Sequence, residues 1–265
     1  MKAITSDSNA GFRHWLRLAT VPRAAREAGQ TLAEGVHLAQ AALDAEVPVA
    51  AILVRRGAAH PEIDAVLARC PDLTPYELAP VLYDRLSPVD NGTGLLLVLP
   101  VPASPLPSAG HCDMVYLDGI QDPGNAGAIL RSAAAAGVRH VLAGAGTAAL
   151  WSPRVLRAAM GAHFRLALHE RVEVAALADV LDGPWIAAVA HEAPSLWSLH
   201  LPAGPLGWIF GAEGSGPTAA ALAASRQRVR IPTSSAVESL NVAAAAAVCL
   251  FERMRRADAA HAGRD

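Results

Sequence analysis

Short apolar runs alternate with helix-like segments through the second half of the chain. The strand-like runs are "DMVYLDGI", "HVLAGAG", "WIAAVAHEA", "GPLGWIFGAEG" and "RVRIPT". Between them, helical spacing of apolar residues marks "NAGAILRSAAAAGV", "SPRVLRAAMGAHF" and "TAAALAASRQ". Strands that alternate with helices in this way predict βαβ units and a parallel sheet with both faces covered.

The last apolar segment, "IPTSSAVESLNVAAAAAVCLFE" (231–252), reads as a strand end, a polar loop and a helix that is apolar on nearly every face. Such a helix is expected to be buried on all sides. The polar residues at its start are then either a helix cap or a site. "SAVE", Ser235 to Glu238, is a capping-box pattern, and Ser239 or Asn241 is an equally good cap for a later start. Taken alone, this stretch favours capping.

The first 100 residues have the pattern of a small α/β domain. Helices are predicted over 32–45 and 60–70, and strands over 49–56 and 94–100. The segment "PVPASPLPSAG" then holds four prolines and no periodicity, which is typical of a linker. We therefore predict a domain over 1–100, a linker over 101–110 and a second domain over 111–265.

Composition excludes some classes of protein. The formal charge of −2 gives no global attraction to nucleic acid, so any such contact must come from a local basic patch. One candidate patch contains Arg13, Arg17, Arg23 and Arg26, and its simplest interpretation is a solvated helix face. Three widely spaced cysteines without a CxxC pair argue against a zinc site and a disulfide framework, and fit a reducing cytosol. We expect no membrane span and no metal.

Three polar, glycine-containing segments follow predicted strands: "DGIQDPGNAGAILR", "GAEGSGP" and "PTSSAVESLN". Ligands bind at the carboxyl ends of strands in parallel sheets, so these segments are the candidate site. A dinucleotide site is the first rival. It requires GxGxxG at the first strand-to-helix turn and a later acid, whereas "GAGTAAL" lacks the third glycine and "GAEGSG" places an acid inside the loop.

Three segments, "NAGAILR", "GWIFGAEGSG" and "IPTSSAVESLNVAAA", resemble in order and spacing the three motifs of the SpoU (TrmH-type) RNA 2′-O-ribose methyltransferases. Upstream, "AREAGQTLAEGVHLAQAAL" more weakly resembles the small ribosomal-protein-like substrate domain of many members. The resemblance implies an S-adenosylmethionine-dependent enzyme with the SPOUT α/β fold, a carboxyl-terminal trefoil knot and a homodimer. With this resemblance, we expect Ser239 and Asn241 to be site residues rather than only helix caps.

The resemblance also implies roles for single residues. Cofactor-binding positions are Phe210, Gly211, Ala212, Ile231 and Leu240. We expect glycine at 211 because a ligand pressed against the backbone leaves no room for a side chain. The catalytic positions are Asn125, Arg131, Glu213, Ser239 and Asn241. A guanidinium scarcely loses its proton, so we expect Arg131 to clamp a phosphate and stabilise the developing alkoxide rather than act as a base.

The third motif departs from the family pattern at Thr233, Ser235 and Ala243, and we expect these departures to affect the fine placement of the substrate. The leading interpretation is a ribose methyltransferase acting on rRNA, with tRNA as the alternative substrate, and with the four basic-patch arginines selecting RNA through its backbone. A second hypothesis, from another class, is a non-catalytic RNA-binding or ribosome-assembly protein that keeps the knot.

Overall fold

The computed structural model describes residues 1–89, 92–234 and 238–262, which form two compact units. The first unit contains Met1–Ala103 and Trp151–Phe164, and the second contains Ser104–Leu150 and Arg165–Asp265. The proline-rich segment forms no helix or strand over 101–109. The sequence pattern predicted one boundary in that segment and did not predict that 151–164 would pack with the first unit.

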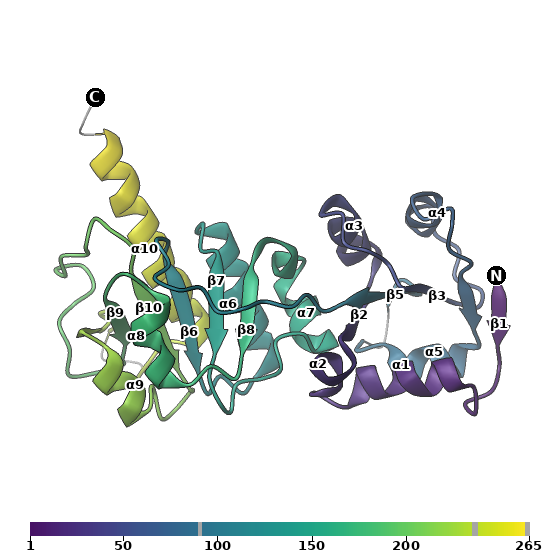
Figure 1. Ribbon diagram of the computed structural model, residues 1–265, viewed down its shortest axis with the longest axis horizontal. Coiled ribbons are helices and arrows are strands. Elements are labelled where there is room, and N and C mark those ends of the chain that lie inside the picture. Colours follow the sequence, from purple (N-terminus) through teal and green to yellow (C-terminus); the bar gives the residue numbers. More distant parts are fainter. Residues whose placement is uncertain (90–91, 235–237, 263–265) are drawn as a thin grey trace. The chain divides into compact units, whose positions relative to one another are not determined.

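The first unit is built on a five-stranded mixed sheet with the order β1-β4-β3-β5-β2 (Figure 1). β1, β4 and β3 are parallel, and β5 runs antiparallel to β3 and β2. The strands are β1 Lys2–Ile4, β2 Gln30–Glu34, β3 Ala51–Arg55, β4 Tyr76–Leu78 and β5 Leu95–Pro100. The helices are α1 Ala10–Thr20, α2 Ala24–Ala28, α3 Val36–Asp44, α4 Pro61–Ala68, α5 Pro80–Leu86, α7 Pro153–Ala159 and the 3₁₀ helix η1 Ala162–Arg165.

The helix predicted over 32–45 is wrong in its first part. Leu32 to Glu34 belong to β2, are buried and pair with β5, and α3 begins only at Val36. Gly35 separates the two elements with a φ of 100°, a backbone conformation that L side chains rarely adopt. Pairing with β5 therefore overrides the helical spacing of this segment.

The second unit is built on a six-stranded sheet with the order β11-β9-β10-β6-β7-β8. All its strand pairs are parallel, which confirms the predicted parallel sheet. Every residue of β6 and β10 is buried, as expected for strands covered on both faces. The strands are β6 Met114–Asp118, β7 His140–Ala143, β8 Ala167–Glu170, β9 Trp185–Ala188, β10 Gly207–Gly211 and β11 Gln227–Val229.

Helices α6 and α10 pack against each other beside this sheet (Figure 1). The helices of the unit are α6 Pro123–Ala135, η2 Val174–Ala176, α8 Leu177–Val180, α9 Ala219–Ala224 and α10 Val242–Ala262. The expectation that α10 is buried on all sides is wrong for the single chain. Ala243, Ala246 and Cys249 are buried, but Phe251 and Met254 are 45% and 40% exposed. None of the described helices is long and apolar enough to cross a membrane.

An ion pair between the exposed Arg157 and the buried Glu34 links the 151–164 segment to β2 within the first unit. Arg157 of α7 donates to Oε2 of Glu34 at 2.5 Å, and the Glu34 side chain is only 1% exposed. Burial raises the pKa of Glu34, and Arg157 opposes that rise. The hydroxyl of Thr31 also donates to the carbonyl of Trp151. These contacts link β2 to a segment more than 100 residues away in the sequence.

We predict that Arg157→Ala destabilises the protein by about 2 kcal/mol or more at pH 8, because it leaves a buried carboxylate without its counter-ion. The loss should shrink as the pH falls. A carboxyl group whose pKa is raised in the folded state binds its proton more readily there, so the cost of burying Glu34 is present at high pH and disappears once it is protonated. Urea unfolding midpoints between pH 5 and pH 8 measure this trend.

The matched control is Arg154→Ala, since Arg154 lies on the same helix, is exposed and has no ion pair in the described part of the chain. It should change stability by less than about 0.5 kcal/mol. An Arg157→Ala deficit that stays constant between pH 5 and pH 8 would contradict the role given to Glu34.

Candidate functional site

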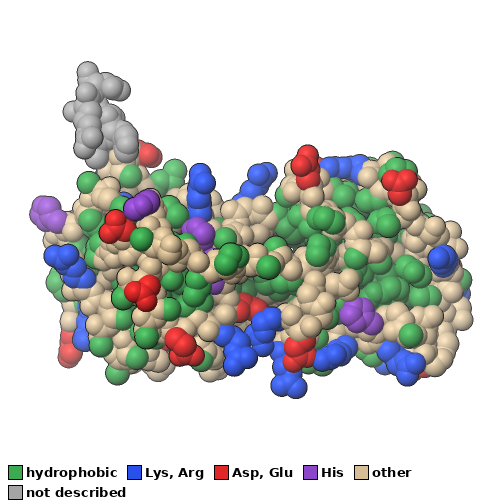
Figure 2. Space-filling model, in the orientation of Figure 1, with side chains coloured by type: hydrophobic (Ala, Val, Ile, Leu, Met, Phe, Trp, Pro, Cys, Tyr) green, Lys and Arg blue, Asp and Glu red, His purple; other side chains and the backbone are tan. Residues whose placement is uncertain are grey.

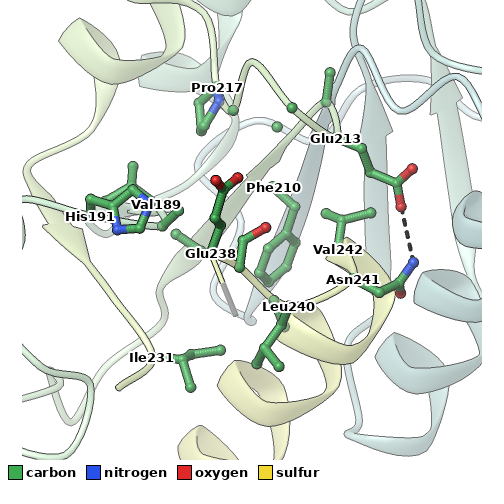
Figure 3. A pocket seen from close by; sticks show the side chains of 18 of the residues that line it. Val189, His191, Phe210, Glu213, Pro217, Ile231, Glu238, Leu240, Asn241 and Val242 are labelled. Atoms are coloured by element: carbon green, nitrogen blue, oxygen red, sulfur yellow. Dashed lines mark hydrogen bonds between the residues drawn. The ribbon is translucent and has the colours of Figure 1, made fainter. Parts of the chain in front are cut away.

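A cavity of about 480 Å³ opens at the carboxyl ends of the central strands of the second unit (Figure 3). We call it the main cavity. Its volume lies within the roughly 300–1,000 Å³ of small-molecule sites. Its walls come from the ends of β9 and β10, the loop after β10 and the start of α10. Its lining residues are Ala188, Val189, Ala190, His191, Phe210, Gly211, Ala212, Glu213, Gly214, Gly216, Pro217, Ile231, Thr233, Glu238, Ser239, Leu240, Asn241, Val242 and Ala245.

Three polar side chains from distant parts of the sequence meet beside this cavity. The amide of Asn125, near the start of α6, donates to Oε1 of Glu213, which follows β10. The amide of Asn241 donates to the same Glu213 oxygen and to Oδ1 of Asn125, both at 2.9 Å. We call these residues the polar triad. The structure therefore brings together one residue from each of the three segments that the sequence marked.

Asn241 also caps α10. Its Oδ1 accepts hydrogen bonds from the backbone N–H groups of Ala243 and Ala244. Its carbonyl oxygen and its amide group thus serve different partners at the same time, so the choice between cap and site does not arise for this residue. The alternative capping box at Ser235 to Glu238, and the departure at Ser235, lie partly or wholly outside the described residues.

A second hollow, of about 500 Å³, adjoins the main cavity. It is lined by Gly119, Ile120, Gln121, Asp122, Pro123, Asn125, Ala212, Glu213 and Ser215. Ala212 and Glu213 line both spaces, Asn125 only the second hollow and Asn241 only the main cavity. The polar triad therefore stands at the partition between two neighbouring spaces.

The five residues predicted to bind a cofactor, Phe210, Gly211, Ala212, Ile231 and Leu240, all line the main cavity. The backbone of the chain gives a further reason for glycine at position 211, besides the one expected from a ligand. A Cβ atom there would lie 1.9 Å from the backbone nitrogen of Pro217 and 2.1 Å from the carbonyl carbon of Gly216. Gly211 is therefore required by the loop that folds back over β10, and any ligand adds to that constraint.

The predicted catalytic residues are only partly brought together. Ser239 lines the main cavity with Glu213 and Asn241. Arg131 is exposed on α6 and lines neither space, and its side chain has no ion pair or hydrogen bond within the described ranges. It lies six residues after Asn125, about 240° around the helix and roughly 9 Å further along its axis. In the single chain, Arg131 and the polar triad thus project from different sides of α6.

Sequence reasoning missed one wall of the main cavity. Val189, Ala190 and His191 follow β9, and Glu238 precedes the predicted Ser-Leu-Asn stretch. The sheet order offers the signal: β9 lies between β10 and β11, so its carboxyl end falls between two of the predicted loops. From the sequence alone, the position of β9 in the sheet was unknown.

The charges at the two spaces are of one sign. Glu213 and Glu238 line the main cavity and Asp122 lines the second hollow, whereas no Arg or Lys of the described chain lines either. Across all residues that the structure describes, no group of three or more His, Cys, Asp or Glu side chains is arranged to hold a metal ion.

The basic patch of the first unit is partly neutralised. Arg17 and Arg23 both form ion pairs with Glu27, the latter at 3.1 Å, while Arg13 is exposed. Arg26 also has an interaction partner. On the face shown in Figure 2, basic side chains lie among acidic ones rather than forming one continuous basic surface.

Comparison with known proteins identifies relatives over the full length of the chain. It is 29% identical over 260 residues to 23S rRNA (guanosine(2553)-2′-O)-methyltransferase RlmP of Bacillus subtilis, covering 95% of this chain and 98% of that protein. A crystal structure of an RNA 2′-O ribose methyltransferase is 31% identical, with a TM-score of 0.79 and coverage of 97% and 99%.

The fold also matches the SpoU methyltransferase AviRb from Streptomyces viridochromogenes in complex with AdoMet. The TM-score is 0.83 at 23% identity, over 94% of this chain and 98% of that one. Residues 114–251, more than half of the chain, match the model of the SpoU rRNA Methylase family. The chain therefore belongs to the SpoU rRNA Methylase family.

Proposed function

We propose that this protein transfers a methyl group from S-adenosylmethionine to a ribose 2′-hydroxyl of RNA, with rRNA as its substrate. The observation that carries the proposal is the polar triad at the partition between two spaces. Both spaces have the size of a small-molecule site, about 480 and 500 Å³, so one can hold a cofactor and the other part of a second reactant. The names of the full-length relatives support the reaction and the choice of rRNA.

The main cavity fits this cofactor. Phe210, Val189 and Leu240 offer apolar surface for an adenine ring, and the acidic lining suits a ligand that carries positive charge. When bound, S-adenosylmethionine supplies a methyl group on a sulfonium, whose departing sulfur becomes neutral. Phe210, Gly211, Ala212, Ile231 and Leu240 are the residues that we propose hold it.

The residues of the chain then have to position the attacking hydroxyl. Asn125 lines the second hollow, so we propose that it orients the ribose there, with Ser239 assisting from the main cavity. Glu213 and Asn241 hold the loops on either side of the partition in register through their shared hydrogen bonds. Such fixed positioning lowers the barrier because it removes the entropy cost of aligning the two reactants.

We propose that Arg131 acts on the RNA rather than on the cofactor. Its exposure and its lack of a partner within the described ranges leave the guanidinium available for a phosphate. In the proposed step the 2′-oxygen bonds to the methyl carbon while the carbon–sulfur bond breaks, and the hydroxyl proton passes to water. The guanidinium, paired with the phosphate, stabilises the negative charge that develops on that oxygen.

We propose that the domain over 1–100 selects the RNA and that the domain over 111–265 carries the reaction. Arg13, Arg17, Arg23 and Arg26 are the proposed backbone contacts. Glu27 pairs with two of them, so RNA phosphates have to displace that carboxylate from Arg17 and Arg23. Contacts of this kind fix register on the RNA without reading its sequence.

We further propose a homodimer, a carboxyl-terminal trefoil knot and a cytoplasmic location. The exposed apolar side chains of Leu240, Phe251 and Met254, at or near α10, support a partner surface there. The family resemblance supports the knot. The thiols of Cys70, Cys112 and Cys249 are free, which fits a reducing compartment.

A non-catalytic RNA-binding function is the second candidate. It is favoured by the position of Arg131 outside both spaces and by Thr233, which lines the main cavity where the family pattern has another residue. This candidate predicts cofactor binding without methyl transfer to any RNA.

We predict that Arg131→Ala lowers the single-turnover rate of methyl transfer by about 10²–10³-fold, because it removes charge stabilisation of the transition state. Its affinity for S-adenosylmethionine should be unchanged, since Arg131 does not line the cavity. Arg131→Lys should be intermediate. The measurement is transfer of radiolabelled methyl to rRNA and tRNA from a strain that lacks this gene, with label sought at alkali-resistant linkages.

The matched control is Arg139→Ala, which removes another exposed arginine from the same unit. Label in rRNA with the wild-type protein, lost only with the Arg131 variant, supports the proposal. Label in tRNA alone would change the substrate class, and no label in either RNA despite cofactor binding would favour the non-catalytic candidate.

We predict that Asn241→Asp and Asn241→Ala separate the two functions of this side chain. The aspartate keeps an oxygen for the cap of α10 but loses the amide donor and places a negative charge against Glu213. It should stay close to wild-type stability and lose methyl transfer by 100-fold or more. The alanine should lose about 1 kcal/mol of stability as well. An active Asn241→Asp variant would show that the bonds to Glu213 and Asn125 are dispensable.

We predict that Phe251→Asp converts a dimer into a monomer at micromolar concentration, because a charge would replace a 45% exposed apolar side chain of the proposed surface. Val81→Asp is the control, since Val81 is 74% exposed on α5 of the first unit. Sedimentation velocity distinguishes the states. A wild-type monomer, or a dimer indifferent to Phe251→Asp, would refute this surface.

A further inference from the structure

Glu238 is a carboxylate that neither the family resemblance nor the proposed mechanism uses. It lines the main cavity, and Figure 3 shows its carboxyl group directed into the space between His191 and Phe210. Within the described residues it forms no ion pair and no hydrogen bond. Its charge is therefore available to whatever occupies the cavity.

No permanently charged basic side chain of the described lining faces this carboxylate, and His191 is the basic residue beside it. Glu213 is the other acidic residue of the cavity lining, and its partners, Asn125 and Asn241, are uncharged amides. No Arg or Lys of the described lining offers compensation, and the three residues outside the description, Ser235 to Val237, carry no ionisable side chain. A cavity with walls of one sign concentrates field lines and attracts ligands of the opposite sign.

The reaction changes the charge of its cofactor by one unit. S-adenosylmethionine carries a carboxylate, an ammonium and a sulfonium, and so has one net positive charge. S-adenosylhomocysteine, the product, has lost the sulfonium charge and is neutral overall. Because the two molecules otherwise share the same groups, a cavity can separate them strongly only through that charge or through the methyl group itself.

We propose that Glu238 is a specificity residue that makes the main cavity favour the cationic methyl donor over its neutral product. This inference rests on the proposed function, because it concerns the same cavity and cofactor. Such a preference helps turnover, since the product leaves the cavity more readily than the donor does. Glu238 acts through its charge and takes no part in breaking or forming bonds.

The test is isothermal titration calorimetry of the full-length protein with S-adenosylmethionine, S-adenosylhomocysteine and sinefungin, an analogue that carries an amine near the position of the sulfonium. Glu238→Gln keeps the size of the side chain and removes the charge. We expect it to lower the affinity ratio of S-adenosylmethionine to S-adenosylhomocysteine by about three- to tenfold, the range for one partly screened charge. The affinity for sinefungin should fall together with the affinity for S-adenosylmethionine.

Two further variants make the result specific. Glu238→Asp keeps the charge and should keep the wild-type ratio. Glu192→Gln removes a carboxylate next to His191 that does not line the cavity, and it should leave the ratio unchanged. The preference of the wild-type protein should also decrease between 0.05 M and 0.5 M salt, because mobile ions screen partly exposed charges.

The possible outcomes distinguish a failure of this inference from a failure of the proposed methyltransferase function. An equal loss of affinity for both cofactor forms in Glu238→Gln would overturn the inference, because the side chain would then be a steric or hydrogen-bonding contact. A shift of the ratio by Glu192→Gln as large as that by Glu238→Gln would also overturn it. A wild-type protein that binds neither cofactor form would overturn the proposed function itself.

Discussion

The hydrogen bonds of the Asn241 side chain are the constraint on which the rest of the site depends. One end of the amide caps α10, and the other reaches Glu213 and Asn125. The start of the last helix is therefore fixed against the loop after β10 and against the start of α6. Since these segments form the partition between the two spaces, one side chain sets the geometry of both.

The parallel sheet makes this meeting possible. β10 and β6 are neighbours in register, with Gly211 opposite Asp118, so the loops that follow them leave the same edge side by side. Asp118 reinforces the arrangement, because its buried carboxylate accepts a hydrogen bond from the backbone N–H of Thr218 at 2.6 Å. The close fit of Gly211 under Gly216 and Pro217 then folds the glycine-rich loop back over the strand end. Backbone packing thus shapes the cavity before any ligand arrives.

The distribution of charge separates the proposed cofactor site from the proposed RNA contacts. Of the two spaces, the main cavity is lined by Glu213 and Glu238, which suit a cationic donor and disfavour a phosphate in that cavity. The arginines proposed to contact RNA, including Arg131, lie outside these spaces. A polyanionic substrate and a cationic cofactor can therefore approach the same reaction centre by different surfaces, without either having to displace the other.

The sequence alone determined the alternation of strands and helices, the parallel sheet and the three polar loops, because hydrophobic periodicity and glycine-rich turns are local properties of the chain. It could not determine that β9 lies beside β10, and so it missed Val189 and His191. Glu238 lies inside one of the marked loops, but its direction into the cavity is a property of the tertiary structure. The sequence pattern misplaced the start of α3, since pairing between β2 and β5 is a long-range contact. The double role of Asn241 and the exposure of Arg131 were decided only by the tertiary structure. Both depend on which helix faces and strand ends are brought together in space, and a one-dimensional pattern does not record that.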